Sequence, residues 1–250
     1  MILAIETATD VCGAALVHQQ RVVSQQTVIE KNIHSEKLLP MIDGVLRAAS
    51  VPLNSIDAIA VSIGPGSFTG LRIGLSTAKG LAVALARPLI AVPTLDALVQ
   101  EYVRSERVTT KKTVCALIDA KRDEAFYAFY SVDAAGFRKR SEYQIASASS
   151  IVEAVAHQGL VVFIGDGTGK IRNTPGLKKE MSYVDSIRCN PVSVGMLAEQ
   201  GGIRLTPSET SVLEPMYLRD FAATQPGGRR MGTSPPSHIL PESIGHPLEG

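Results

Sequence analysis

The sequence predicts an α/β protein made of two similar lobes, each with a mixed sheet flanked by helices. Short apolar runs rich in β-branched residues alternate with longer segments whose apolar residues recur at helical spacing. One layout also occurs twice: a strand ends in an apolar residue, an acid follows, and a polar turn closed by aspartate leads into a second strand. The two copies are Ile5–Asp10 and Ile118–Asp123. This recurrence indicates an internal duplication, which would place the two acids, Glu6 and Asp119, at the mouth of a shared cleft.

The first half of the chain contains predicted strands and two predicted helices. The strands are expected at Met1–Ile5, Gly13–His18, Val22–Ile29, Ile56–Ile63 and Leu89–Val92. The first helix is expected after Ser35, which suits an N-cap, because the apolar residues that follow form one stripe. These apolar residues are Leu38, Leu39, Ile42, Val45, Leu46 and Ala49. The second helix is expected from Phe68 to Ala86, where Arg87-Pro88 stops it.

The second half repeats the theme. Its strands are expected at Thr113–Ile118, Glu124–Tyr130 and Leu160–Ile164, with a helix at Ser193–Gln200 and a closing segment at Leu213–Leu218. We therefore expect an N-terminal lobe over residues 1–100 and a C-terminal lobe over residues 101–222. Residues 223–250 form a tail rich in proline and glycine with few large apolar residues, and we expect this tail to be mobile.

The composition narrows the class of protein. Of 250 residues, 45% are hydrophobic and 20% are charged, and the formal net charge is +1. A near-neutral chain lacks the basic field of a free-standing nucleic-acid-binding protein. Three widely spaced cysteines suit a reducing compartment. The N-terminus has no positively charged leader, and the apolar runs are too short to span a bilayer, so we expect a cytoplasmic protein.

The strongest local feature is the glycine-rich segment Gly64–Gly74, which follows a predicted strand and opens a predicted helix. Backbone N–H groups at such a junction can bind an anion. The segment lacks the lysine followed by serine or threonine that completes a P-loop. A tight strand-to-helix junction is the alternative interpretation.

Small residues recur every four positions along that helix. They are Gly66, Gly70, Gly74, Ala78, Ala82 and Ala86. Because glycine within a helix costs about 1 kcal/mol relative to alanine, the two interior glycines need a compensating gain. One interpretation is close packing against the protein's own sheet. The other is a flat face that docks a partner helix beside the first helix. The predicted partner interface comprises Leu38, Leu39, Ile42, Leu46, Gly70, Gly74 and Ala78.

Several polar residues could carry chemistry. The two acids could assist a metal-dependent hydrolysis, and the loop after Leu160–Ile164 could cradle an adenosine or a phosphate, although a plain turn is the alternative. The predicted residual nucleotide site comprises Glu6, Thr7, Thr9, Asp119, Gly165 and Gly167. His34 has no neighbour at ligand spacing, so we expect neither a metal site nor a catalytic residue. Basic runs such as Lys111-Lys112 and Arg138-Lys139-Arg140 suit a solvated face, with contacts to nucleic-acid phosphates left open.

The segment Gly64–Ala82, GPGSFTGLRIGLSTAKGLA, closely resembles the signature of the TsaB (YeaZ) family. Supporting segments are His34–Pro40, Pro93–Leu98, Ile118–Arg122 and Pro215–Arg219. The resemblance spans about residues 1–222. It implies the actin-like ATPase (ribonuclease-H-like) fold and a role in adding threonylcarbamoyl to the adenosine next to the anticodon of tRNAs. It also implies pairing with the catalytic subunit TsaD and the ATPase TsaE.

The resemblance also bears on catalysis. TsaD relatives carry His-x-x-x-His metal ligands, whereas this chain has His34 followed by Leu38. Nucleotide-binding members of the fold have glycine two residues after the first acid, where this chain has Ala8 and Lys121. TsaB relatives commonly have aspartate where this chain has Glu6. We therefore expect a non-catalytic subunit with no cofactor beyond weak or vestigial ATP or ADP binding.

We also expect this subunit to be a homodimer when alone and to meet tRNA only through the complex. The alternatives are a nucleotide-dependent phosphotransferase or hydrolase of the actin-like ATPase superfamily, and a metallopeptidase.

Overall fold

The computed structural model describes residues 1–156, 158–176 and 181–218. Met1–Leu218 forms one compact unit. The segment expected to be a tail, residues 223–250, lies outside the described residues. Among the residues that are described, no helix has the length and apolar character that a membrane crossing requires.

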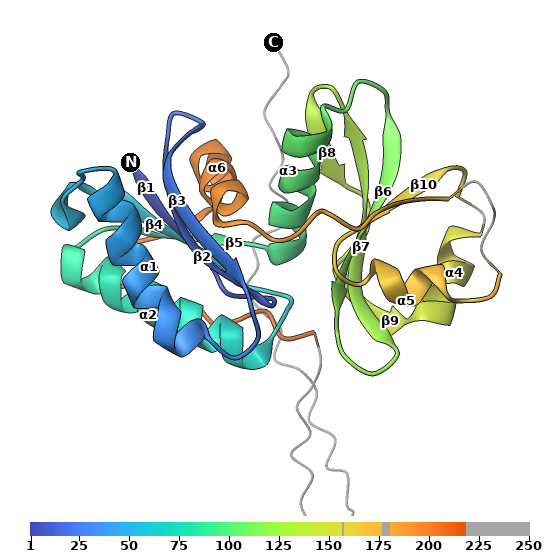
Figure 1. The fold of residues 1–250 in the computed structure, drawn as a ribbon, viewed down its shortest axis with the longest axis horizontal. Helices are drawn as coiled ribbons and strands as arrows, with labels where there is room; N and C mark the ends of the chain where they lie inside the picture. The colour runs from blue at the N-terminus through green and yellow to red at the C-terminus, as the bar shows by residue number, and fades with distance from the viewer. Residues whose placement is uncertain (157, 177–180, 219–250) are drawn as a thin grey trace, which may run out of the picture. The chain divides into compact units, whose positions relative to one another are not determined.

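Sheet A is built mainly by the first half of the chain (Figure 1). Its strands, in spatial order, are β12 (Ile203–Leu205), β5 (Leu89–Val92), β4 (Ala58–Ser62), β1 (Ile2–Glu6), β2 (Val11–His18) and β3 (Arg21–Ile29). β1, β2 and β3 are antiparallel neighbours, whereas β4 and β5 run parallel to β1. Helices α1 (His34–Ala48) and α2 (Phe68–Leu85) cover one face, and α6 (Pro191–Gly201) covers the other.

Sheet B repeats this plan in the second half. Its strands are β11 (Ser182–Val184), β10 (Val161–Ile164), β6 (Lys112–Asp119), β7 (Glu124–Asp133) and β8 (Gly136–Lys139), and β9 (Gln144–Ser147) also pairs with β7. As in sheet A, three neighbouring strands are antiparallel, here β6, β7 and β8, and β9 is also antiparallel to β7. On the other side of β6, strands β10 and β11 run parallel to it. Helices α4 (Ala148–Val155) and α5 (Thr168–Arg172) cover one face, and α3 (Thr94–Glu106) covers the other. Two copies of this order make the ribonuclease-H-like fold, so the expected fold class is confirmed.

Helices α3 and α6 lie between the two sheets and contact each other. The Ser193 hydroxyl of α6 donates a hydrogen bond of 2.6 Å to the Glu101 carboxylate of α3. The hydroxyls of Tyr130 and Tyr143 hold Asp96 of α3 on sheet B, at 2.8 and 2.9 Å. The expected lobe boundary between residues 100 and 101 falls inside α3, and α6 from the second half covers sheet A. Each half of the chain therefore contributes structure to the other half.

Some local predictions need correction. α1 begins at His34 with Ile33 at its N-cap and no side-chain cap, so Ser35 lies inside the helix. The closing segment Leu213–Leu218 is neither helix nor strand, but its Met216 N–H donates to the Ile63 carbonyl at 2.7 Å. The elements α3, α4, α5, β8, β9, β11 and β12 were not predicted from the sequence. Of these, only α3 carried a clear signal, because Leu95, Leu98, Val99 and Tyr102 recur at helical spacing.

Candidate functional site

Glu6 ends β1 and lies wholly inside the protein. Its side chain has no exposed surface. One carboxylate oxygen accepts a hydrogen bond of 2.6 Å from the Ala8 N–H, and the other accepts one from the Ser62 hydroxyl. Burial raises the pKa of Glu6 to about 7, although the hydrogen bonds from Ser62 and from the backbone of Ala8 and Thr7 lower it in part. The carboxyl group is therefore a structural element of the turn.

The N-terminal part of α2 packs directly on that turn. A β-carbon on Gly70 would lie 2.1 Å from the Thr7 carbonyl oxygen, and one on Gly74 would lie 2.1 Å from the Thr7 hydroxyl oxygen. The Thr7 hydroxyl donates a hydrogen bond of 2.8 Å to the Gly70 carbonyl. Glycine is required here because any side chain would separate the helix from the turn. The predicted role of Gly70 and Gly74 in a partner interface is therefore wrong: their side of α2 faces the protein's own turn, and Ala78 lies in the core.

His34 stabilises the same turn from the side of α1. Its Nε2 lies 3.0 Å from the Thr9 carbonyl oxygen and 3.1 Å from the Val11 carbonyl oxygen. The Thr9 hydroxyl accepts a hydrogen bond of 3.2 Å from the Val11 N–H. Leu38, one helical turn after His34, is buried in the core of sheet A. Within the ranges that the structure describes, no three His, Cys, Asp or Glu residues are grouped to hold a metal ion.

Asp119 ends β6 in the position that corresponds to Glu6, but it is partly exposed. Lys170 of α5 donates a hydrogen bond of 2.5 Å to its carboxylate and one of 2.8 Å to the Glu124 carbonyl. The Lys121 N–H donates a further bond of 2.7 Å to the carboxylate. Burial acts to raise the pKa of Asp119, but the hydrogen bonds and charges of Lys170 and Lys121 outweigh it and hold the pKa below its ordinary value.

The glycine-rich loop after β10 is filled by neighbouring backbone. Gly165 has a φ of +101°, and a β-carbon on it would lie 2.1 Å from the Leu117 carbonyl oxygen. A β-carbon on Gly167 would lie 3.0 Å from the Leu117 β-carbon. Between them, the Asp166 carboxylate accepts a hydrogen bond of 2.9 Å from the Asp119 N–H. These glycines allow the end of β10 to pack closely against β6, which accounts for their presence without a ligand.

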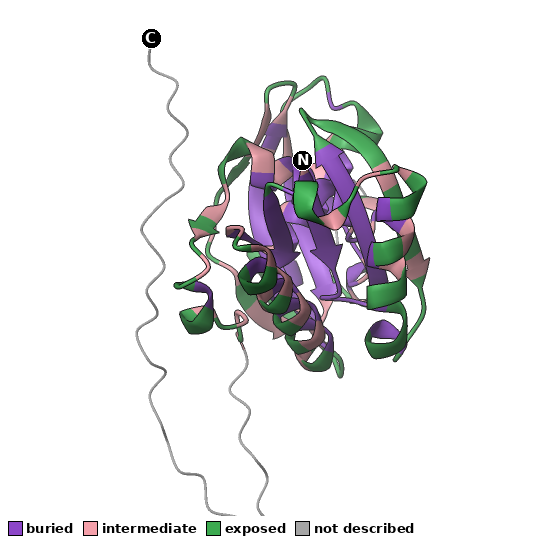
Figure 2. Cartoon of the chain, turned by 90° about the vertical axis from the view of Figure 1, so that its left-hand side faces the viewer, coloured by how far each residue is buried: buried purple, intermediate pink, exposed green. Residues whose placement is uncertain are grey.

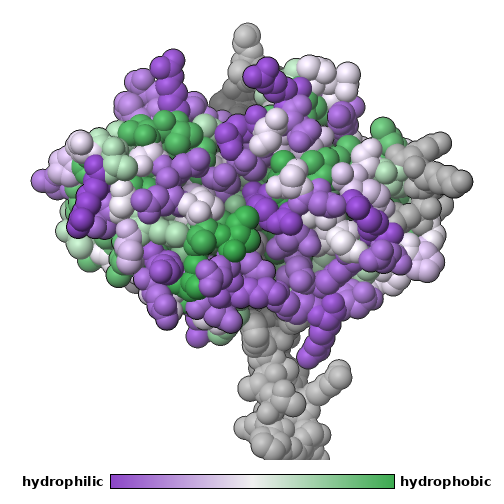
Figure 3. Space-filling view, in the orientation of Figure 1, coloured by the Kyte–Doolittle hydropathy of each residue, from purple (hydrophilic) through white to green (hydrophobic). Residues whose placement is uncertain are grey.

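The outer face of α1 and α2 exposes apolar side chains next to a groove. Leu39 on α1 and Val83 on α2 are each 59% exposed. A groove of about 550 Å³ is lined by Leu39, Ile42, Asp43, Leu46, Arg47, Leu81 and residues 50–53. Figure 2 shows exposed and intermediate residues along the outer side of the helices that cover the buried sheet. In the view of Figure 3 the hydrophobic residues form separate patches within a mostly hydrophilic surface.

A second stripe of small residues, which the sequence analysis missed, lies on the exposed side of α2. It consists of Ser76, Gly80 and Ala84, again four residues apart. A β-carbon on Gly80 would meet no atom within 4 Å. The inner stripe and this outer stripe share one spacing, so spacing alone could not tell which of them faces solvent. Of the predicted interface residues, Leu39 is exposed, while Leu38, Ile42 and Leu46 point mainly into the core and the last two also line the groove.

Comparisons with known proteins place these features in a family. A protein-family model for TsaD, described as tRNA N6-adenosine threonylcarbamoyltransferase, matches residues 20–224. The tRNA threonylcarbamoyladenosine biosynthesis protein TsaB of Escherichia coli is 32% identical in an alignment of 234 residues that covers 89% of this chain and 96% of that protein. The chain belongs to the TsaB family. The TsaB protein of Buchnera aphidicola subsp. Schizaphis graminum is 30% identical over 188 residues, 74% of this chain and 87% of its own length.

The solved structure of YeaZ from Pseudomonas aeruginosa supports the same fold for this TsaB-family chain. It has a TM-score of 0.74 and 29% sequence identity, over 87% of this chain and 99% of that chain. The residues predicted to form a nucleotide site and the residues predicted to form a partner interface have different surroundings. Glu6, Thr7, Thr9, Asp119, Gly165 and Gly167 all make contacts within the chain. The open surface lies instead over α1 and α2.

Proposed function

We propose that this TsaB-family chain is a non-catalytic subunit in tRNA threonylcarbamoyladenosine biosynthesis, and that it binds a TsaD-type transferase through the outer face of α1 and α2. This α1–α2 face comprises Leu39, Ser76, Gly80, Val83 and Ala84. The observation that carries the proposal is the exposed stripe of small residues beside an exposed leucine and an apolar groove. Small residues allow a second helix to approach closely, and the leucine would fill the space between helices.

A TsaD-type partner suits this face for a specific reason. The match to the TsaD model covers residues 20–224, a range that includes both α1 and α2. A TsaD-type subunit would then carry an equivalent helix pair, and two such pairs can pack as a four-helix bundle. In the absence of TsaD, the same face would pair with a second copy of this chain, giving a homodimer. TsaE would join the assembled pair.

The non-catalytic role is supported by how the polar residues are used. The Glu6 carboxylate, the His34 ring and the Asp119 carboxylate all make hydrogen bonds within the chain. A nucleotide-dependent enzyme would need Asp119 for magnesium or phosphate. Calorimetric titration with Mg-ATP should therefore give little or no saturable heat, and Asp119→Ala should not change it. Tight ATP binding that Asp119→Ala removes would favour the phosphotransferase or hydrolase instead.

The interface can be tested by co-purification of this chain with TsaD. Leu39→Glu places a charge on the α1–α2 face, and Gly80→Leu fills the outer stripe, so each should weaken TsaD binding by at least about tenfold. Leu160→Glu is the matched control, since Leu160 is 56% exposed on the side of sheet B. The control should bind normally. Normal binding by both α1–α2 variants would show that the interface lies elsewhere.

Reconstituted tRNA modification tests the role itself. With TsaD, TsaE and the threonylcarbamoyl donor present, modification should depend on this chain. The Leu39→Glu variant should lose that support in proportion to its loss of TsaD binding. Asp119→Asn should retain it, because Asp119 is assigned no chemical step. Modification by this chain without TsaD would refute a non-catalytic role.

A further inference from the structure

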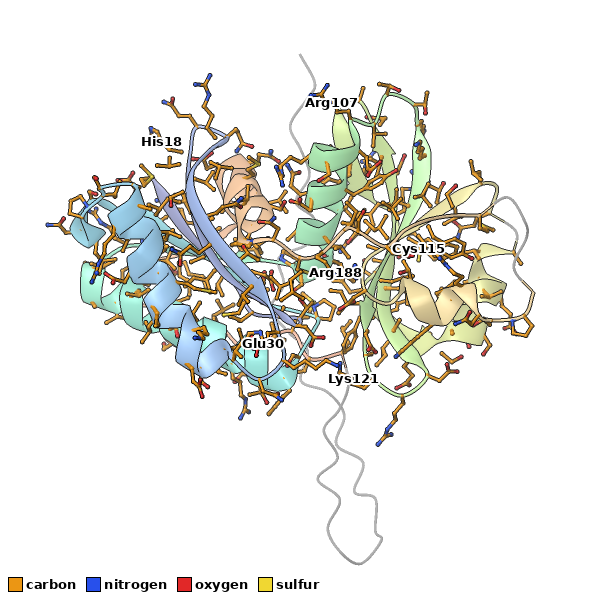
Figure 4. The ribbon with its side chains drawn as sticks, in the orientation of Figure 1. His18, Glu30, Arg107, Cys115, Lys121 and Arg188 are labelled. Carbon is orange, nitrogen blue, oxygen red and sulfur yellow. The ribbon has the colours of Figure 1, made fainter. Side chains whose placement is uncertain are left out.

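The fold gathers cations from separate parts of the sequence at one end of sheet B. We call this surface the basic end; it comprises Arg107, Lys111, Lys112, Arg138 and Arg140. Figure 1 shows the C-terminal end of α3, the start of β6 and the β7–β8 hairpin at the same end of the sheet. Figure 4 places Arg107 at this end and Lys121 at the opposite end. The structure therefore brings Lys111-Lys112 close to Arg138 and Arg140, although the two runs are separated in the sequence.

Strand register shows how close these residues are. Lys112 at the start of β6 is opposite Val132 of β7, and Arg138 of β8 is opposite the adjacent Ser131. Neighbouring strands are about 4.8 Å apart, so the backbones of Lys112 and Arg138 are separated by roughly 10 Å. The Arg140 N–H donates to the Phe129 carbonyl at 2.7 Å, which fixes Arg140 two positions further along the same edge.

The cations surround the edge strand. Phe137 and Val132 pack in the cluster beneath α3, so Lys112, which pairs with Val132, lies on that side of the sheet. Side chains alternate along a strand, so Arg138 lies on the other side. Arg140 is one residue beyond β8, but its N–H bond to Phe129 continues the pairing, which puts it on the same side as Arg138. β8 is the edge of sheet B. The basic end is thus a ridge with positive charge on both flanks, at an edge that no other strand covers within the described part of the chain.

These five cations also lack the ion pairs that neutralise other basic residues of the chain. Within the described residues, no salt bridge or side-chain hydrogen bond involves any of them. By contrast, Arg47, Arg104, Lys170 and Arg172 each pair with a carboxylate. The acids nearby are Glu106, Asp133 and Glu142; Asp133 accepts a hydrogen bond of 2.9 Å from the Ala135 N–H, and Glu142 faces Lys139 at 3.8 Å. Positive charge therefore remains in excess.

We propose that the basic end binds the phosphate backbone of tRNA. This inference rests on the proposed function, which brings the chain to tRNA, and it adds a surface through which the chain itself contacts the RNA. Arginine and lysine side chains that are free of protein carboxylates can each neutralise a phosphate and release its counterions. A near-neutral chain can still do this locally, because exposed charges are screened beyond about 8 Å at physiological salt.

This contact would recognise the shape and charge of the tRNA backbone and would have no base specificity. Phe137, the aromatic residue of β8, is partly buried against the core cluster and makes an edge contact with Tyr130, so its ring does not form an open stacking platform. Base recognition in RNA usually needs such aromatic surfaces or splayed bases. The basic end would position the tRNA and leave base recognition to another subunit.

The test is the salt dependence of tRNA binding by the complex of this chain with TsaD, measured by fluorescence anisotropy of a labelled tRNA transcript. Arg138→Gln with Arg140→Gln removes two charges. Each lost phosphate contact should reduce the slope of log K against log salt by about 0.7–0.9, so the pair should reduce it by roughly 1.5. The dissociation constant near physiological salt should rise by about tenfold.

The matched control is Arg21→Gln with Arg204→Gln. Both residues are exposed on strands of sheet A, and within the described residues neither has an ion pair. The control should change neither slope nor affinity. Circular dichroism melting and TsaD co-purification should be unchanged in both double variants.

Three outcomes would overturn the proposal. An unchanged slope of log K against log salt in the Arg138→Gln, Arg140→Gln variant would show that these arginines contact no phosphate. An equal change in the control would show a general charge effect. Unchanged tRNA binding with loss of TsaE binding would assign the basic end to an acidic protein partner. If the chain does not bind TsaD at all, the proposed function fails, and the same titration on the chain alone still decides whether the basic end binds RNA.

Discussion

The ends of β1 and β6 are equivalent in the duplicated fold, yet their acids lie in opposite environments. Glu6 is fully buried and receives only neutral donors, which are the Ser62 hydroxyl and the backbone N–H groups of Thr7 and Ala8. Asp119 is partly exposed and faces the ammonium group of Lys170 at 2.5 Å. Burial without a cation raises the pKa of Glu6, whereas the cation lowers the pKa of Asp119. Position in the fold alone therefore does not give an acid its role; the neighbouring groups do.

The helices that follow explain the divergence. α2 is 18 residues long and rests on the Glu6 turn, which it can do only because Gly66, Gly70 and Gly74 have no side chains. α5 has only 5 residues and contributes Lys170 to the Asp119 turn. Close helix packing excludes water from the first turn, and a short helix leaves the second turn open to solvent. The Glu6 turn is therefore part of the core beneath the α1–α2 face.

Among the variants that test the packing of α2 on the Glu6 turn, a substitution of Gly70 should cause the largest loss of stability. Gly70→Ala places a methyl group 2.1 Å from the Thr7 carbonyl oxygen, a backbone atom that cannot move without displacing the Glu6 turn. We expect a loss of about 2–4 kcal/mol in the free energy of unfolding, measured by urea denaturation. On the same helix, Gly80→Ala meets no atom within 4 Å and should gain up to about 1 kcal/mol from helix propensity. Equal effects of the two substitutions would contradict the close packing of α2 on the turn.

The pH dependence of stability should show the next largest effect. The pKa of Glu6 is about 7 in the folded protein against a reference value of 4.5. Between these values the folded state holds a proton that the unfolded state has lost, so stability falls as pH rises from about 4.5 to 7 and then levels off. The shift corresponds to about 3 kcal/mol. Urea denaturation at pH 5, 6, 7 and 8 measures it.

Glu6→Gln is the variant that isolates this effect. Glutamine keeps an oxygen that can accept from the Ala8 N–H but cannot ionise, so the decline in stability between pH 5 and 7 should shrink by the Glu6 contribution. Burial also raises the pKa of Asp96 and that of Asp166, so a smaller decline should remain. Asp119→Asn serves as the control, because Asp119 titrates below its ordinary range and should leave that decline intact. A Glu6→Gln protein with the same pH profile as wild type would show that another group is responsible.

The sequence predicted much of this fold for physical reasons that apply locally. The strands β1 to β5 of sheet A follow from apolar runs and alternation, and the end of helix α2 follows from Arg87-Pro88. Strand β12, which completes sheet A, was not predicted. The repeated acid turns could also be identified, because the layout recurs. The exchange of α3 and α6 could not be predicted, since it depends on contacts between the halves such as Ser193 with Glu101.

The role of the small residues on α2 was also beyond local reasoning. Ser76, Gly80 and Ala84 have the same spacing as Gly70, Gly74 and Ala78. Only the position of the Thr7 turn decides which stripe is inside. The cations of the basic end raise the same difficulty: they come from a helix end, a strand start and an edge strand, which only the topology of sheet B brings together.

The smallest expected effect concerns the ion pair of the Asp119 turn. Lys170→Met keeps the length of the side chain and removes its charge, so Asp119 loses the cation that favours its ionised form. Because the pair is partly exposed, the loss of stability at neutral pH should be only about 0.5–1 kcal/mol. The wild-type contribution is present above the unfolded pKa of aspartate and is lost as pH falls through the lower folded pKa, the opposite direction to Glu6. An NMR titration of the Asp119 carboxyl carbon should show a higher pKa in the variant. If that pKa stayed low, the Lys121 N–H and charge, not Lys170, would be what separates the two acids.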